Sequence, residues 1–245
     1  MTRLLEVCVD SLASARAAIR GGADRLELCS ALAIGGLTPS PALLEQIRAE
    51  SDIPVRCLMR PRAGDFLYTK EEILLMAREI DLLRTAGADG FVIGCLTADG
   101  CLDGQAMKPL LTAAEGAGLT LHRCIDVSRD LTETYLAAGS LGIDTVLTSG
   151  GASSCLKGME PIGQLLSMDG PQVLIGAGVN TSAIETFRSR FPEATAFHMS
   201  GKTEIESGMR FRRDGIPMGI PGFDEWHIQL TSEENVRTAR TSLDR

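Results

Sequence analysis

Glutamate and cysteine occur twice at the same spacing near the start of the chain. Residues 5–8 read LEVC and residues 26–29 read LELC, so Glu6 stands two positions before Cys8 and Glu27 two positions before Cys29. Each pair lies in a run that is apolar enough for a buried strand, where an unpaired carboxylate is costly to desolvate. Carboxylates kept in such places can act as acids or bases, and thiolates bind soft metal ions.

The spacing of two puts each glutamate on the same strand face as its cysteine, because successive side chains point to opposite sides. If the leucines and valines between them face outward, both glutamates and both cysteines face inward. On neighbouring strands, about 4.8 Å apart, Cys8 and Cys29 could then share a soft ion such as Cu(I). The spacings typical of four-ligand zinc sites, C-x₂-C and H-x₃-H, do not occur in the sequence. We therefore expect Cys8 and Cys29 to be metal ligands.

These two strands belong to a regular alternation of strand-like and helix-like segments. The strand-like runs are residues 4–9, 25–29, 53–59, 90–94, 119–124, 145–148, 173–176 and 196–199. Helical patterns lie at 11–21, 41–50, 70–86, 104–117, 129–141, 157–168 and 181–190, with a last one at 232–243. Eight units of about 30 residues predict an α/β fold, a (β/α)₈ TIM barrel, with an open doubly wound sheet as the alternative. We expect a single domain over residues 1–245, with an irregular extension from about residue 200 that ends in a helix.

Several helix starts are marked by capping residues. Ser40 precedes a proline, which suits the first position of a helix. Thr69 and Thr231 are each followed three residues later by a glutamate, the spacing of a capping box. We expect all three residues to cap helices.

Barrels of this type carry their chemistry at the C-terminal ends of the strands. The polar residues found there give these candidates for catalysis: Glu6, Glu27, Arg60, His122, Arg123, Asp126 and His198. We expect Glu6 or Glu27 to exchange a proton together with His122. Arg60 and Arg123 would hold an anion. The alternative is that these charges only satisfy one another inside the barrel.

Three glycine-containing turns follow the last three strand-like runs: TSGG at 148–151, GAGV at 176–179 and SGKT at 200–203. Many barrels bind phosphate after their seventh and eighth strands through backbone N–H groups. We expect Ser149, Gly150, Gly176, Gly178 and Ser200 to contact such a group. Alternatively, the glycines only permit tight turns with positive φ.

Composition narrows the class of protein. The chain has 245 residues, of which 44% are hydrophobic and 23% charged, and a formal net charge of −8 that opposes nucleic acids and anionic membranes as partners. No stretch approaches the roughly 20 apolar residues of a membrane helix, and the start lacks the pattern of a signal peptide. Seven scattered cysteines suit a reducing compartment. We expect a cytoplasmic protein with free thiols.

Eight segments carry a family resemblance, in order from about residue 4 to residue 215: LEVCVDS, GGADRLELCSALAIGGLTPS, RPRAGDFLYT, GADGFVIGCLTADGCLD, LTLHRCID, VLTSGGASS, IGAGV and GMRFRRDG. The chain resembles the copper homeostasis protein CutC family. The resemblance implies a TIM barrel in the cytoplasm, assembled as a homodimer or homotetramer and linked to copper handling. The family's motif positions match Glu6, Cys8, Glu27, Cys29, Arg60, Pro61, Arg62, Gly64, Asp65, Phe66, His122, Arg123, Asp126, Thr148–Gly150, Gly176–Val179, His198 and Ser200.

Three functional hypotheses follow. The first is a copper homeostasis protein that binds Cu(I) through Cys8 and Cys29 at the C-terminal mouth of the barrel. The second is an enzyme of lyase, isomerase or hydrolase type that acts on a small phosphorylated or carboxylated metabolite. The third is a catalytically silent scaffold whose barrel mouth is an oligomer interface.

Overall fold

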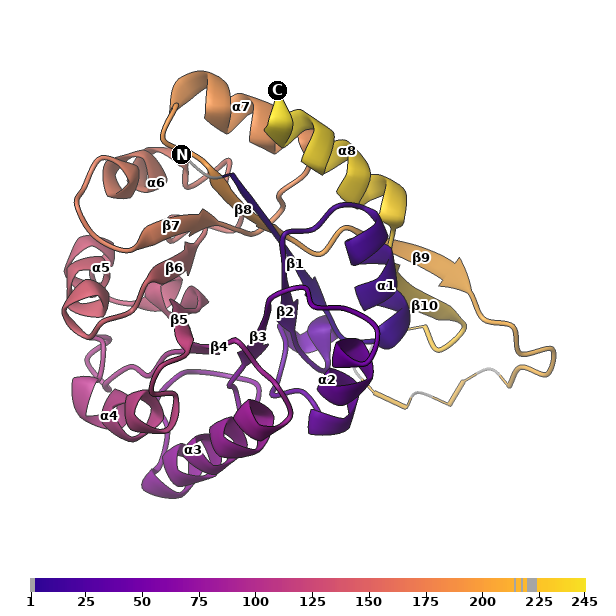
Figure 1. Ribbon diagram of the computed structural model, residues 1–245, viewed down its shortest axis with the longest axis horizontal. Coiled ribbons are helices and arrows are strands. Elements are labelled where there is room, and N and C mark those ends of the chain that lie inside the picture. Colours follow the sequence, from indigo (N-terminus) through magenta and orange to yellow (C-terminus); the bar gives the residue numbers. More distant parts are fainter. Residues whose placement is uncertain (1–2, 214, 217, 220–223) are drawn as a thin grey trace.

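The computed structural model describes residues 3–213, 215–216, 218–219 and 224–245, and its centre is a closed barrel of eight parallel strands (Figure 1). The strands are β1 (Leu4–Val9), β2 (Arg25–Leu28), β3 (Val55–Leu58), β4 (Gly90–Ile93), β5 (Gly118–Leu121), β6 (Thr145–Thr148), β7 (Gln172–Ile175) and β8 (Ala196–Met199). The surrounding helices are α1 (Leu12–Arg20), α2 (Pro41–Arg48), α3 (Lys70–Thr85), α4 (Gly104–Ala113), α5 (Leu131–Ser140), α6 (Met159–Leu166), α7 (Thr181–Arg190) and α8 (Glu233–Asp244). The fold is the (β/α)₈ barrel that the alternation predicted.

The two faces of the strands divide as their sequence pattern predicted. Leu5, Val7 and Val9 of β1 are fully buried in the main apolar core, which they share with residues of the surrounding helices such as Phe187. The intervening Glu6 is also fully buried, but it lies among polar side chains. The barrel therefore has an apolar outer layer and a partly ionic interior.

The register of the closing strands determines which interior residues meet. Along β1 and β2, Glu6 lies opposite Arg25 and Cys8 lies opposite Glu27. Along β1 and β8, Glu6 lies opposite His198. Closure of the barrel therefore brings three strands together around one carboxylate.

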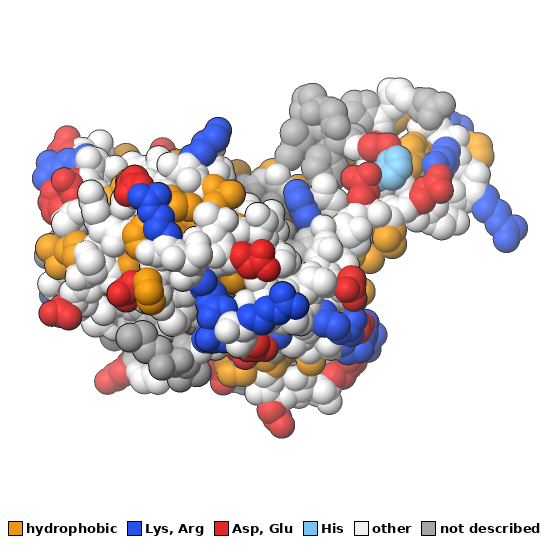
Figure 2. Space-filling model, turned by 90° about the horizontal axis from the view of Figure 1, so that it is seen from above, with side chains coloured by type: hydrophobic (Ala, Val, Ile, Leu, Met, Phe, Trp, Pro, Cys, Tyr) orange, Lys and Arg blue, Asp and Glu red, His pale blue; other side chains and the backbone are white. Residues whose placement is uncertain are grey.

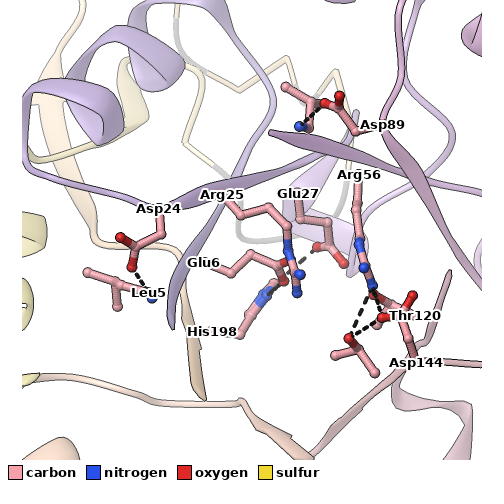
Figure 3. A network of polar contacts seen from close by, with 12 residues as sticks. Leu5, Glu6, Asp24, Arg25, Glu27, Arg56, Asp89, Thr120, Asp144 and His198 are labelled. Carbon is pink, nitrogen blue, oxygen red and sulfur yellow. Dashed lines mark hydrogen bonds and ion pairs between the residues drawn. The ribbon is translucent and has the colours of Figure 1, made fainter. Parts of the chain in front are cut away.

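A second ionic group inside the barrel is centred on Arg56 of β3 (Figure 3). Its Nη1 lies 2.8 Å from Asp144 Oδ1 and donates to the hydroxyl of Thr120 at 2.6 Å. Gly118 leaves room for this guanidinium, because a Cβ there would lie 2.5 Å from Arg56 Nη2. The glycine is thus required by packing, and Arg56 is held on several sides.

Two of the predicted helix caps are confirmed and one is wrong. Ser40 caps α2, and Thr69 caps α3 in a complete capping box with Glu72. At α8 the cap is Ser232, whose side chain accepts from the N–H of Asn235, so the helix begins one residue later than the capping box at Thr231 predicted.

The chain leaves strand geometry sooner after β5 than expected. The predicted run 119–124 ends at Leu121, and Arg123–Val127 form a short 3₁₀ helix, η2. His122 caps this helix, because its Nδ1 accepts from the N–H of Cys124 at 3.2 Å. A side-chain acceptor at this place turns the chain and fixes the imidazole. A second short 3₁₀ helix, η1 (Leu32–Ile34), follows β2.

The segment after residue 200 is more regular than expected. It contains the antiparallel strands β9 (Lys202–Glu206) and β10 (His227–Thr231), so the expectation of an irregular extension is wrong there. Figure 2 shows this segment projecting from the body of the barrel. The last helix, α8, returns to pack against α1 and α7 (Figure 1). In the described ranges, no helix has the length and apolarity needed to cross a membrane.

Candidate functional site

A cavity of about 900 Å³ opens at the C-terminal ends of the barrel strands. Its wall includes the candidates Cys8, Glu27, Arg60, His122, Arg123, Asp126, Gly178, His198 and Ser200. These residues lie on β1, β2, β3, β5, β7 and β8 or on the segments that follow these strands. The mouth of the barrel therefore collects most of the residues that the sequence singled out.

Glu6 lies beneath this cavity and is bound on both sides (Figure 3). Its Oε2 accepts from Arg25 Nε at 2.5 Å, and its Oε1 lies 2.7 Å from His198 Nδ1. Burial alone would raise the pKa of Glu6, but the charge of Arg25 and the hydrogen bond from His198 outweigh it and bring the pKa to about 2. Glu6 is an ionised carboxylate that positions its neighbours, and both of its oxygens are occupied.

Arg25 is the functional residue that the sequence argument missed. The alternative in which the candidate charges satisfy one another offered Arg60 and Arg123 as the guanidinium partners of the glutamates, but the guanidinium paired with Glu6 belongs to Arg25. The signal was available: Arg25 stands two positions before Glu27 and therefore shares its inward face.

Glu27 and His198 form the end of the same ionic group that borders the cavity. The two side chains approach to 3.8 Å between Glu27 Oε2 and His198 Nε2. Burial raises the pKa of Glu27, helped by the charge of Glu6 and opposed by His198. Burial would lower the pKa of His198, but Cys8 and the two glutamates raise it well above its usual value. The imidazole is thus held as a cation between two carboxyl groups, one of which is biased toward protonation.

Cys8, Glu27 and His198 bring three potential metal-ligand atoms together, all within 4.8 Å of one another. Glu6 holds the Nδ1 of His198, which leaves Nε2 as the ring atom toward the other two donors. A carboxylate that fixes the far nitrogen of an imidazole is the usual support for a metal-ligating histidine. The cluster therefore has the composition and the support of a metal site.

The pairing of Cys8 with Cys29 as metal ligands stays a prediction, and the three-donor cluster contains Cys8 but not Cys29. Cys8 lies opposite Glu27 in the strand register, while Cys29 lies two residues further on, just past the end of β2. The Cys29 thiol donates to Glu27 Oε2 at 3.4 Å, and burial with the nearby negative charges raises its pKa well above the usual value. Cys29 is therefore a thiol that keeps its proton beside the cluster.

Arg60 and His122 lie together beside Phe66, and among the described residues neither makes a hydrogen bond or ion pair with Glu6 or Glu27. The Arg60 guanidinium donates to three backbone carbonyls, and its Cζ lies 5.4 Å from the centre of the Phe66 ring. The His122 ring lies 4.7 Å from the same phenyl ring, centroid to centroid. Burial and the charge of Arg60 lower the pKa of His122 to about 3, so the ring is neutral at physiological pH. The expected joint action of His122 with Glu6 or Glu27 has no contact to support it in the described residues.

The turn after β6, which we predicted to bind phosphate, instead binds the carboxylate of Asp126. Asp126 accepts hydrogen bonds from the backbone N–H groups of Ser149 and Gly151 and from the hydroxyl of Thr148. Arg123 closes the group, with its Nε 2.7 Å from Asp126 Oδ2. The Arg123 charge is thus already compensated, and this turn does not offer free donors to a phosphate.

The other predicted turn residues divide in two. The N–H of Gly150 donates to the hydroxyl of Thr148, and the N–H of Gly176 donates to the carbonyl of Thr148. Contrary to our expectation, neither N–H is free to bind a phosphate. Gly178, with φ +78°, and Ser200 border the cavity and stay predicted contacts of a ligand.

Comparisons with known proteins agree with one another. The model of the CutC family matches residues 3–203. A CutC family protein of Chromobacterium violaceum is 37% identical over 247 residues and covers 100% of both chains. The human copper homeostasis protein cutC homolog is 39% identical over 238 residues, 96% of this chain and 87% of its own. The crystal structure of a CutC protein from Streptococcus agalactiae has a TM-score of 0.76 at 25% identity, covering 81% of this chain and 99% of that one. The chain therefore belongs to the CutC family.

Proposed function

We propose that this protein serves copper homeostasis by binding Cu(I) at the mouth of the barrel, with Cys8 and His198 as the main ligands. The observation that carries the proposal is the convergence of the Cys8, Glu27 and His198 donor atoms within 4.8 Å. The name of the human relative, a copper homeostasis protein, supports copper as the cargo.

The donor chemistry suits Cu(I) in part. A thiolate is a soft ligand that selects Cu(I), and imidazole also binds copper well, whereas a carboxylate prefers harder ions. Glu27 is therefore better suited to another task. Copper must replace the protons of the Cys8 thiol and the His198 ring. Glu27, 3.8 Å from His198 Nε2, is placed to take up a proton that leaves.

Anaerobic titration with Cu(I) against a chromophoric chelator tests this site. Cys8→Ser and His198→Asn should each weaken binding by about tenfold or more, the equivalent of one lost strong interaction. Cys29→Ser is the matched control, since it removes a buried thiol that lies next to Glu27 but is not one of the three clustered donors. If Cys29→Ser weakens binding as much as Cys8→Ser, or if Cys8→Ser binds copper like the parent, the site is not the one proposed.

A second candidate function is an enzyme of lyase, isomerase or hydrolase type that acts on a small anionic metabolite. The observation that favours it is the cavity itself: at about 900 Å³ it has the size of an organic ligand site and far exceeds one ion. The raised pKa of Glu27 in its wall suits a general acid. Incubation with pooled phosphorylated and carboxylated metabolites, followed by proton NMR, should show turnover that Glu27→Gln abolishes. Turnover that survives Glu27→Gln would contradict this role.

The cytoplasmic location and the homodimeric or homotetrameric state remain predictions from the family resemblance. Size-exclusion chromatography with light scattering tests the second of these. A monomer at micromolar concentration would contradict it.

A further inference from the structure

Two buried nitrogen atoms in the residues that line the cavity, Arg60 Nε and His122 Nε2, have no hydrogen-bond partner among the described residues. Arg60 is 8% exposed and His122 is 4% exposed. Buried polar groups are nearly always paired, and an unpaired one costs about 1–3 kcal/mol. Two such atoms on residues of one cavity wall are therefore a candidate binding site.

Both atoms are hydrogen-bond donors. The guanidinium of Arg60 keeps all its protons in proteins. In His122 the Nδ1 accepts a hydrogen bond from the N–H of Cys124 at 3.2 Å, so Nδ1 carries no proton. A neutral imidazole with a bare Nδ1 has its proton on Nε2. A ligand that satisfies both atoms must therefore present acceptors.

The charge of Arg60 sets the sign of that ligand. Its remaining donors go to the neutral carbonyls of Ile34, Gly36 and Gly64, at 3.0–3.1 Å. Within the described residues, no carboxylate oxygen comes within 4.0 Å of this guanidinium. The cavity's other arginine differs in this respect, since Arg123 is paired with Asp126. Arg60 thus presents a buried, uncompensated positive charge, which favours an anion.

Phe66 places the two donors in one subsite. The same phenyl ring lies 5.4 Å from the Arg60 Cζ and 4.7 Å from the centre of the His122 ring, measured from its centroid. The ring also adds an apolar surface beside the donors. From this geometry we infer that Arg60, His122 and Phe66 form a binding site for the oxyanion of a small organic molecule, either a carboxylate or a phosphoryl group. The site is independent of copper, and it deepens the second candidate function, on which it rests, by assigning the anionic group of the metabolite to named residues.

Titration with inorganic phosphate, and in a second arm with malonate, tests the site. The readout is the ¹⁵N spectrum of the imidazole rings, because the chain has only three histidines to assign. One or both anions should shift the His122 Nε2–H signal and raise the melting temperature. A response to phosphate alone identifies a phosphoryl site, and a response to malonate alone a carboxylate site.

Substitutions locate the response. Arg60→Gln and His122→Asn should each weaken anion binding about tenfold, as expected for one charge-assisted hydrogen bond. Asparagine at position 122 keeps an acceptor for the cap and removes the Nε2 donor together with the ring that lies against Phe66. Arg123→Gln, which also removes one positive charge from the cavity, should change the affinity less than threefold, because that charge is already paired.

Three results would overturn the inference. The first is no response to either anion, and the second is equal binding by the parent and His122→Asn. The third is a ring spectrum that places the His122 proton on Nδ1, which is measured on the parent protein and needs no variant to fold. Cys8→Ser should bind the anion normally, so failure of the copper proposal and failure of this one are separate results.

Discussion

The neutral His122 makes a quantitative prediction about acid stability. Its pKa in the folded state is about 3, against a value of 6.5 for a free imidazole. Because the folded pKa is the lower one, the unfolded chain takes up the proton first as the pH falls. The contribution of the neutral His122 ring to the free energy of unfolding is present in full above pH 6.5 and is lost between pH 6.5 and about pH 3. Within that window the loss is about 1.4 kcal/mol per pH unit, so about 2 kcal/mol is lost at pH 5.

Urea unfolding followed by circular dichroism from pH 7.5 to pH 4 measures this contribution. His122→Asn is the reference, because it keeps the cap on η2 but does not titrate. Other acid-sensitive groups, Glu6 among them, are common to both proteins, so the difference between the two curves isolates His122. Below pH 6.5 the parent should lose stability relative to the variant. Parallel curves, or an NMR titration midpoint of His122 near 6.5, would refute the reasoning.

Three further predictions concern stability at neutral pH, each measured by urea unfolding. Glu6→Gln should lose about 3–5 kcal/mol, because it leaves Arg25 buried without its counter-charge, and a loss below about 1 kcal/mol would contradict the pairing. Gly94→Ala should lose at least about 3 kcal/mol or fail to fold, because the added Cβ would lie 2.5 Å from the sulfur of Cys124. The control is Gly104→Ala, whose Cβ would have no atom closer than 3.9 Å, and it should be neutral or stabilising. Thr69→Ala should lose about 1 kcal/mol with the capping box of α3, and an unchanged midpoint would show that the cap is dispensable.

Most of the barrel was predictable from the sequence. Each strand has a compact apolar run and each helix its own amphipathic pattern, so local signals identify the βα units one at a time. The strands β9 and β10 escaped this reasoning for a physical reason. Every residue of β9 is exposed, so Lys202–Glu206 shows no alternation between a buried and a solvent face. Its strand geometry comes from pairing with β10 and leaves no pattern in the sequence.

The site was predictable as far as strand faces decide it. The alternation of side chains along each strand placed Glu6, Cys8 and Glu27 inside the barrel. It does not determine the register, that is, which residues on neighbouring strands lie opposite each other. The stagger of the barrel sets Cys8 opposite Glu27 and leaves Cys29 out of the cluster. Loop contacts were equally hidden: Arg60 is held by carbonyls of two separate loops, and no side-chain pattern encodes such partners.

The closure between β1 and β8 also determines the order in which the chain can complete its interior during synthesis. Glu6 meets Arg25 across 19 residues, but it meets His198 only across 192 residues. A growing chain can therefore form the Glu6–Arg25 pair early, but the Glu6–His198 pair only after nearly the whole barrel has left the ribosome. Until then β1 carries an unpaired edge. Chains that stop before residue 196 leave the edges of both β1 and β7 unpaired and should aggregate. Addition of β8 pairs both edges and closes the sheet into a barrel.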